Sequence, residues 1–144
     1  MKHALRHRTR SLMEADYARL ARFRQALRRF LRFSENAARR AGISPAQYQL
    51  LLFVRAAPHP GAVISHLAER LQVRHQSAVG LIDRCQRAGL VRREKDSRDR
   101  RRAFVRLTPK GARVLACLVL EHYRVIEDLR TAIPRPLSFQ LPPD

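Results

Sequence analysis

The chain has 144 residues, of which 45% are apolar, and its formal net charge is +18. This length is enough to bury one hydrophobic core, so we expect a single domain. A charge so far from zero indicates a polyanionic partner, with nucleic acid as the first hypothesis and an anionic membrane surface as the second. No apolar run reaches 18 residues and no secretory signal pattern occurs, so we expect neither membrane spanning nor export.

Two blocks of the sequence hold almost all of the charge. Residues 1–42 carry 12 basic against 3 acidic residues, a net +9, and residues 70–106 carry 12 against 4, a net +8. The chain has two cysteines, Cys85 and Cys117, which lie in helix-like segments and form no framework of spaced pairs. We therefore expect a reduced, cytoplasmic protein.

Residues 15–41 have the pattern of a long amphipathic helix, because apolar residues recur at spacings of three and four and arginines occupy the other face. Gly42 follows as a left-handed cap, and Ser44-Pro45-Ala46-Gln47 then starts a second helix with an N-cap, a first-turn proline and a capping-box glutamine. The apolar faces of the first and last helices exceed what one small domain covers, which predicts a homodimer. We assign its contact to Leu20, Phe23, Leu27, Leu118, Ile126 and Leu129.

The middle of the chain predicts two helices joined by a tight turn. The run Pro58-His59-Pro60-Gly61 ends the second helix, residues 63 and 64 form a short strand, and Ser65 caps a third helix over 65–71. A fourth helix over 74–88 follows and ends at Gly89. Its apolar residues form a buried stripe at i, i+3, i+4 and i+7, which comprises Ala78, Leu81, Ile82 and Cys85.

The last third of the chain predicts a β-hairpin and a long helix. Residues 90–95 and 103–107 form strands joined by the charged segment 96–102. Thr108 and Pro109 start a helix over 108–133, and the prolines that follow predict a loop over 134–144. Residues 1–14 are predicted to be a flexible basic arm. The order of elements indicates a mainly α fold with a small β-hairpin wing, which is the winged helix-turn-helix arrangement.

The helix over 74–88 has the chemistry of a helix that reads DNA. An α-helix, about 10–12 Å across, fits a major groove about 12 Å wide. The face opposite its buried stripe is polar, and Gln76 near its start can bond adenine bidentately. We assign DNA contacts to Arg74, His75, Gln76, Ser77, Gly80 and Arg84 on this helix and to Arg98, Arg100 and Arg101 in the hairpin.

Five runs in this order together resemble the MarR family (multiple antibiotic resistance regulator): residues 64–71, 77–84, 88–91, 96–101 and 107–111. The resemblance covers about residues 15–133 and implies a homodimer on a pseudo-palindromic operator in double-stranded DNA. It implies a repressor released by a small-molecule effector or by oxidation. It also implies dimerisation helices over 15–41 and 108–133, a DNA-binding lobe over 61–107, and an Asp99 that orients Arg101 at the tip of the wing toward the minor groove.

Several residues have simpler interpretations. The arginines of the first helix fit a solvated face, His3 and His7 fit a mobile arm better than a metal pair, and both cysteines fit an inert core better than a redox switch. No catalytic constellation, phosphate loop or zinc spacing occurs, so we expect no enzyme, no cofactor and no metal. The alternative functions are a non-specific architectural nucleic-acid-binding protein, or a ligand or redox sensor that acts through a protein partner.

Overall fold

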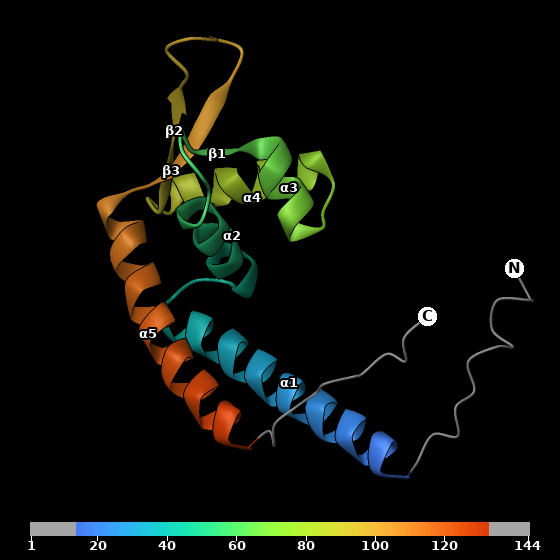
Figure 1. Cartoon of the computed structure of the whole chain (residues 1–144). Helices are drawn as coiled ribbons and strands as arrows, with labels where there is room; N and C mark the ends of the chain where they lie inside the picture. Colours follow the sequence, from blue (N-terminus) through green and yellow to red (C-terminus); the bar gives the residue numbers. More distant parts are fainter. Residues whose placement is uncertain (1–13, 133–144) are drawn as a thin grey trace, which may run out of the picture.

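The computed structural model describes residues 14–132, with side chains up to residue 127. Over these residues the chain order is α1 (Glu14–Arg40), α2 (Pro45–Arg55), β1 (Ala62–Val63), α3 (Ile64–Leu71), α4 (His75–Arg87), β2 (Val91–Lys95), β3 (Ala103–Leu107) and α5 (Pro109–Ala132). Helices α1 and α5 lie side by side at one end, and the β2–β3 hairpin projects from the other end (Figure 1). The fold is mainly helical with a small wing, as the sequence predicts.

The junction between α1 and α2 is built from local caps. Gly42 has a φ of +77°, and the N–H of Ile43 donates to the carbonyl of Ala38 at 3.1 Å, which closes α1 in the way the sequence predicts. The Ser44 hydroxyl accepts from the Gln47 N–H at 3.1 Å, and the Gln47 side chain accepts from the Ser44 N–H at 2.8 Å. This capping box starts α2 within a few residues of the end of α1.

The sheet has three antiparallel strands in the order β1-β3-β2. The sequence predicts the first strand at residues 63 and 64, one residue later than β1 in the structure. The predicted N-cap of α3 at Ser65 is also wrong. Val63 pairs with Phe104 and is therefore extended, so α3 begins at Ile64 directly after the strand. Ser65 lies inside the first turn of α3, whose N-cap makes no side-chain hydrogen bond.

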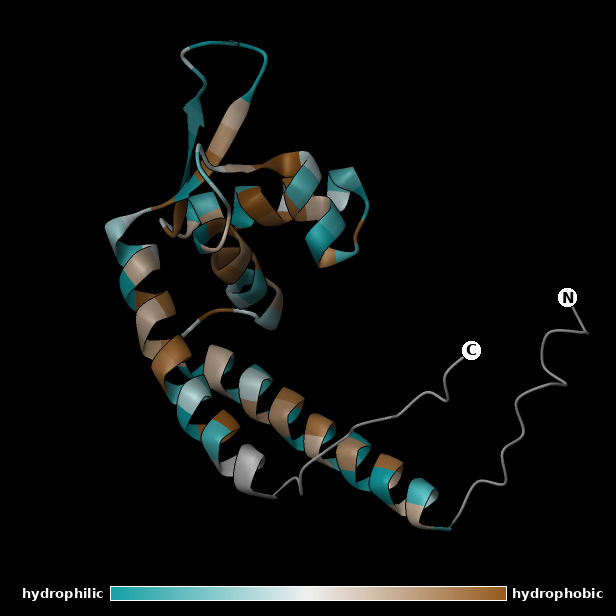
Figure 2. Cartoon of the chain, in the orientation of Figure 1, coloured by the Kyte–Doolittle hydropathy of each residue, from teal (hydrophilic) through white to brown (hydrophobic). Residues whose placement is uncertain are grey.

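The core lies where α2, α3, α4 and the sheet meet. Figure 2 shows hydrophobic residues along these helices. The predicted stripe of α4 is confirmed, because all four of its residues are buried. The core extends along α5 and ends at His122, which is buried where α1, α2 and α5 meet. The Nε2 atom of His122 lies 2.8 Å from Ser34 Oγ of α1. The His122 ring stacks on the ring of Tyr48 of α2, with 4.8 Å between the ring centroids.

The start of α5 packs directly against the segment that follows α4. The Thr108 hydroxyl caps α5 by accepting from the Gly111 N–H at 3.0 Å, and it donates to the Gly89 carbonyl at 2.6 Å. A Cβ at Gly111 would lie 2.0 Å from the Leu90 carbonyl oxygen, so only glycine fits here. The end of α4 and the start of α5 are therefore held against each other.

None of the helices within residues 14–132 combines the length and the apolar run that crossing a membrane requires.

Candidate nucleic-acid interface

The polar face of α4 is open to solvent along its length. Arg74, His75, Gln76, Ser77 and Arg84 are exposed, and Gly80 is half-buried. Within the part of the chain that the structure describes, the side chains of the first five make no hydrogen bond or ion pair. Their donors and acceptors are thus available to a partner molecule.

The beginning of α4 also leaves backbone donors open. Arg74 is the N-cap residue with an extended backbone, at φ −66° and ψ 152°, and its side chain makes no capping hydrogen bond. The N–H groups of the first helical turn therefore have no side-chain acceptor, and they carry the positive end of the helix dipole. Such a helix end is a natural place for a phosphate group.

Gly80 makes room for another side chain of the same helix. A Cβ placed on Gly80 would lie 3.6 Å from Nη1 of Arg84. The Arg84 guanidinium thus folds back over Gly80 toward the N-terminal half of α4, which is the direction that side chains on a helix favour.

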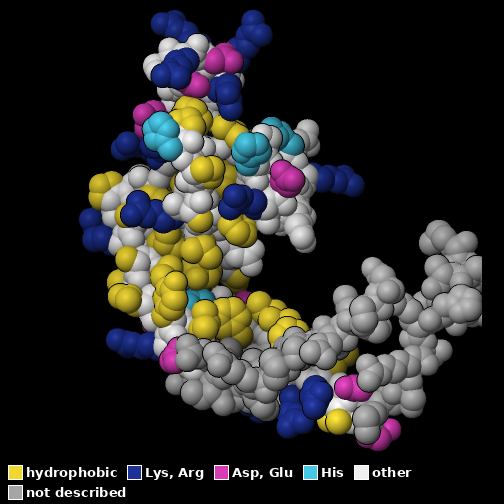
Figure 3. Space-filling model, viewed as in Figure 1, with side chains coloured by type: hydrophobic (Ala, Val, Ile, Leu, Met, Phe, Trp, Pro, Cys, Tyr) yellow, Lys and Arg dark blue, Asp and Glu magenta, His cyan; other side chains and the backbone are white. Residues whose placement is uncertain are grey.

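The tip of the wing is held by two aspartates. The Asp96 carboxylate accepts from the Arg98 N–H at 2.9 Å, and the Asp99 carboxylate accepts from the Arg101 N–H at 3.0 Å. A backbone pair between the Asp96 N–H and the Arg102 carbonyl, at 3.0 Å, closes the loop. Lys and Arg side chains surround the tip, together with acidic side chains (Figure 3). The arginine side chains of this loop make no ion pair within the described residues.

The contact of Asp99 differs from the one expected. The family resemblance implies that Asp99 orients the Arg101 side chain, whereas in the structure its carboxylate bonds the Arg101 backbone N–H. An aspartate carboxylate can accept a hydrogen bond from the backbone N–H two residues later in the chain. This arrangement, an Asx turn, fixes the backbone from which the Arg101 side chain extends.

A bracket between α4 and β2 was not predicted from the sequence. Arg93 of β2 donates to Asp83 at 2.7 Å and to Gln86 at 2.6 Å, both on α4, and its side chain is 29% exposed. Asp83 and Gln86 stand three residues apart on one helix face, which is the only sequence signal for this contact. The bracket joins the base of the wing to the exposed helix.

The residues predicted to form the dimer contact differ in their exposure. Leu20, Phe23, Leu27 and Ile126 are 38–48% exposed, whereas Leu118 is 1% exposed and belongs to the core of its own chain. Leu129 lies within α5, but its side chain is outside the described residues. Further large apolar side chains are exposed on the same two helices, namely Tyr17, Leu31, Leu120 and Tyr123.

The two cysteines differ from each other. Cys85 is fully buried in the core, and burial raises the pKa of its thiol to about 11, so an inert cysteine fits. Cys117 is exposed, which corrects the expectation of a core position. It precedes the buried Leu118 on α5 and therefore points to a different side of the helix. His3 and His7 lie outside the described residues.

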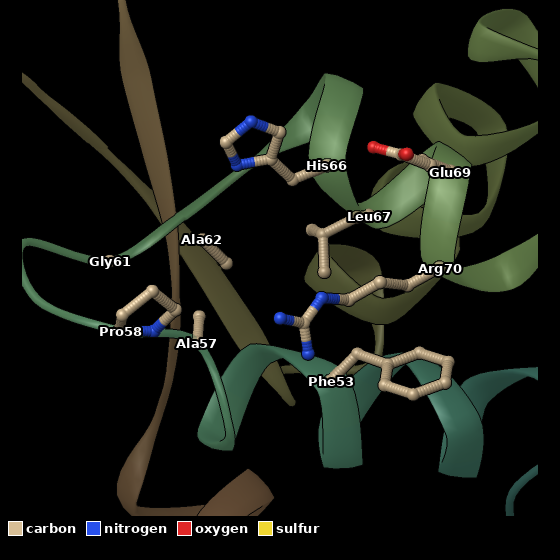
Figure 4. A pocket seen from close by; sticks show the side chains of 9 residues that line it. All are labelled: Phe53, Ala57, Pro58, Gly61, Ala62, His66, Leu67, Glu69 and Arg70. Atoms are coloured by element: carbon tan, nitrogen blue, oxygen red, sulfur yellow. The ribbon is translucent and has the colours of Figure 1, made fainter.

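A hollow of about 440 Å³ lies between the end of α2, β1 and α3 (Figure 4). Its walls include the apolar side chains of Phe53, Pro58 and Leu67, with His66 at one side. The guanidinium of Arg70 points into it and makes no ion pair within the described residues. The hollow therefore combines an apolar surface with one cation.

Comparisons with known proteins agree with this arrangement. The model of the MarR family matches residues 41–102, which run from the end of α1 to the end of the wing loop. A protein of Thauera aromatica that is named as a transcriptional regulatory protein for the hcr operon is 31% identical over 87 residues. That match covers 60% of this chain and 51% of the relative, so it spans about half the relative's length.

Solved structures share the fold. The chain matches AbsC, a MarR family transcriptional regulator of Streptomyces coelicolor, with a TM-score of 0.69 and 22% identity, over 89% of this chain and 86% of AbsC. It matches Staphylococcus aureus MepR in a complex with DNA with a TM-score of 0.66 and 18% identity, over 84% of this chain and 85% of MepR.

Proposed function

We propose that this chain is a transcription regulator of the MarR family, whose model matches residues 41–102, and that it binds a specific sequence of duplex DNA. The observation that carries the proposal is the open polar face of α4 beside a basic wing. The Thauera aromatica relative and AbsC are both named as transcription regulators, which supports a regulatory role over an enzymatic one.

In this proposal α4 enters the major groove with its N-terminal turn foremost. The open N–H groups at Arg74 and His75 bind a phosphate and set the depth of insertion. Gln76 then reads a base edge, for which adenine is the matching partner, and Arg84 reaches a neighbouring base or phosphate across Gly80. The DNA partner of S. aureus MepR supports duplex DNA as the ligand class.

The wing supplies the second contact. Arg98, Arg100 and Arg101 extend from a loop whose backbone is fixed by aspartates, so their side chains can follow the width of an adjacent minor groove. The bracket at Arg93 sets the separation of wing and helix, and thereby the spacing of the two groove contacts. This division assigns residues 61–107 to DNA binding.

We propose a homodimer formed by the helices of residues 15–41 and 108–133. Helices α1 and α5 both expose large apolar side chains, and apolar residues gathered in this way mark a protein–protein contact. A symmetric dimer presents two copies of α4 and favours a pseudo-palindromic operator.

A small anionic effector in the hollow beside α3 is the proposed signal for release from DNA, since Arg70 offers a cation within apolar walls. Oxidation of Cys85 is a weaker candidate because its thiol is buried and its pKa is raised.

A selection of bound duplexes from a random pool tests the function. The proposal expects an enriched pseudo-palindrome with half-sites about one helical turn apart. Recovery of sequences without a consensus at physiological salt would instead support the alternative, a non-specific architectural protein, which the net charge of +18 favours.

A further inference from the structure

We propose that His122 is a positioning residue, whose contacts with α1 and α2 hold α5 at one angle to the core that carries α4. In a dimer formed through α1 and α5, this angle sets the separation of the two copies of α4. His122 would therefore determine which spacing of operator half-sites the protein accepts. The inference rests on the proposed function, because that function supplies the dimer and the operator.

His122 interrupts an apolar stripe of α5. The residues one turn before and one turn after it on the same side of the helix are Leu118, Val119, Val125 and Ile126. His122 is 5% exposed, and no other basic, acidic or amide side chain among those that the structure describes is buried. A polar ring in apolar surroundings costs free energy unless its hydrogen bonds are made, so its partners decide where it lies.

Both ring nitrogens of His122 have a partner, and the two partners lie on different helices. Nδ1 lies 2.6 Å from the Leu118 carbonyl oxygen, which can only accept, so Nδ1 carries a hydrogen and donates it. Nε2 lies 2.8 Å from Ser34 Oγ of α1, and in the neutral ring it accepts from the Ser34 hydroxyl. The first bond fixes the ring relative to α5, and the second ties α5 to α1.

Aromatic rings surround the imidazole of His122. It stacks on Tyr48 of α2, with ring planes 23° apart and ring centroids 4.8 Å apart. Phe30 and Phe33 of α1 make edge contacts with it, at 5.8 and 5.3 Å between centroids. Stacking and hydrogen bonds depend on direction, whereas burial of aliphatic side chains does not. His122 thus joins three helices by contacts that favour one arrangement.

Two contacts far apart on α5 fix its direction. The first is at its start, where the Thr108 hydroxyl donates to the Gly89 carbonyl at 2.6 Å. The second is His122, fourteen residues beyond Thr108 and about 20 Å further along the axis. Figure 1 shows α5 running from the base of the wing to the side of α1. One fixed point leaves a rod free to pivot, and the second point removes that freedom.

The angle of α5 matters because exposed apolar residues of the proposed dimer contact lie beyond His122. Tyr123 and Ile126 are 68% and 43% exposed on the part of α5 that follows it. A change of angle at His122 would move this part of α5 relative to α4, and thereby change the separation of the two α4 helices in a dimer. The half-sites that a rigid dimer reads must match that separation.

A distance measurement that needs neither DNA nor a dimer tests the positioning role. Spin labels are attached at Arg87→Cys on α4 and Gln25→Cys on α1, which are both exposed positions. Cys117→Ser removes the exposed native thiol, and the buried Cys85 stays in place. The labelled chain is diluted with unlabelled chain, so that the measured distance lies within one molecule. We expect one narrow distribution of distances for the otherwise unchanged protein.

Two variants remove the contact and a matched control leaves it. Ser34→Ala takes away the partner of Nε2, and His122→Phe takes away both hydrogen bonds but keeps an aromatic ring. Both should broaden or shift the distribution, and the double variant should match His122→Phe, because the two residues act through one contact. Leu115→Val makes a small cavity on the same buried side of α5 and should keep the unchanged distribution.

Urea denaturation verifies that these variants fold and compares their losses of stability. Equal broadening by Leu115→Val and Ser34→Ala would overturn the proposal, because a loosened core would then explain both. An unchanged distribution in Ser34→Ala and His122→Phe would overturn it as well.

The selected operator then tests the consequence for DNA. Duplexes carry its half-sites at spacings changed in steps of one base pair, and the affinity for each is measured. We expect Ser34→Ala to lower the preference for the best spacing by roughly fivefold, the worth of one hydrogen bond, and Leu115→Val to leave it unchanged. An unchanged preference in Ser34→Ala would overturn the link between His122 and spacing. If the pool yields no consensus but the label distances still broaden, the proposed function is wrong and the positioning role of His122 stands.

Discussion

The two basic regions of this molecule hold their arginines in different ways. In the wing and at its base, acidic side chains fix the geometry: Asp99 bonds the Arg101 backbone, and Asp83 holds the Arg93 guanidinium. On α1, by contrast, Arg24, Arg28, Arg29 and Arg32 are exposed on a regular helix, with no acid paired to them within the described residues. The cations of the wing region are thus held in position by acidic side chains, whereas those of α1 are arranged only by the spacing of the helix.

This difference has a functional consequence. A contact discriminates between sequences only when its donors are held in a fixed direction relative to the bases. Cations at a regular spacing bind any phosphate row and confer affinity without specificity. The comparison predicts that substitutions at the wing and α4 change specificity, whereas substitutions on α1 change general affinity for nucleic acid.

The largest expected effect is at the anchor that holds α5 against the end of α4. Gly111→Ala places a Cβ 2.0 Å from the Leu90 carbonyl oxygen, and the backbone must move to relieve the overlap. We expect a loss of about 2–4 kcal/mol in the free energy of unfolding, measured by urea denaturation.

Gly80→Ala is the matched control for that variant. Its Cβ would meet only the end of the flexible Arg84 side chain, at 3.6 Å, and alanine is the better helix former by about 1 kcal/mol. Gly80→Ala should therefore be as stable as wild type or more so. Equal stability of Gly111→Ala and wild type would show that the anchor is looser than the structure indicates.

The bracket between α4 and β2 is expected to matter next. Arg93→Ala frees the wing from α4, and we expect operator binding to weaken by about 1–2 kcal/mol, with a smaller loss on random duplex. Arg92→Ala removes the same charge from the neighbouring position of β2, whose pair with Glu94 is exposed and longer, at 3.6 Å. Fluorescence anisotropy titrations compare the two, and identical losses would mean that Arg93 contributes charge alone.

The aspartate at the tip of the wing should have an effect of about 1 kcal/mol. Asp99→Ala makes the protein more positive, so electrostatics alone predicts tighter binding, whereas loss of the bond to the Arg101 N–H predicts weaker binding to the operator. Asp99→Asn keeps an oxygen that can accept from that N–H while it removes the charge. The structure predicts weakening by alanine and not by asparagine in the same titration. Tighter binding by both variants would contradict the assignment.

The smallest expected effect is on α1. Arg28→Glu replaces two repulsive i, i+4 neighbours by two attractive ones, Arg24 and Arg32, so the free energy of unfolding should rise by about 0.5 kcal/mol. Affinity for random duplex should fall at the same time. Arg28→Gln, which removes the repulsion without adding attraction, should give a smaller rise in urea denaturation. A destabilised Arg28→Glu would show that Arg28 has a structural role.

The elements with local signals were predictable from the sequence. Gly42 and the Ser44 capping box depend on residues a few positions apart, and the stripe of α4 depends on helical spacing. The strand at Ala62 was displaced by one residue because its limits depend on pairing with β3, some 40 residues away in the chain. Local chemistry suggested a cap at Ser65, but the extended backbone imposed by the sheet decided where α3 begins.

The sequence predicted which face of α4 is open to a partner, but not the contacts that hold the candidate site together. Helical spacing places Gln76 and Arg84 on the open side of α4, yet it does not indicate that Arg93 reaches Asp83 from β2. Similarly, spacing put Leu118 and Ile126 on one apolar face, while the packing of the core buries Leu118 and leaves Ile126 43% exposed. Periodicity identifies the side of a helix that is apolar, and tertiary packing determines what covers it.

The most direct test of the central claim compares Gln76→Ala with wild type on two duplexes, the selected operator and a random duplex, at one fixed salt concentration. Gln76 is exposed and has no partner within the described residues, so its removal should leave the fold and the phosphate contacts unchanged. We expect a loss of about 1–3 kcal/mol on the operator and almost none on the random duplex. Equal loss on both duplexes, or no loss on either, would contradict the claim that α4 reads the sequence of DNA.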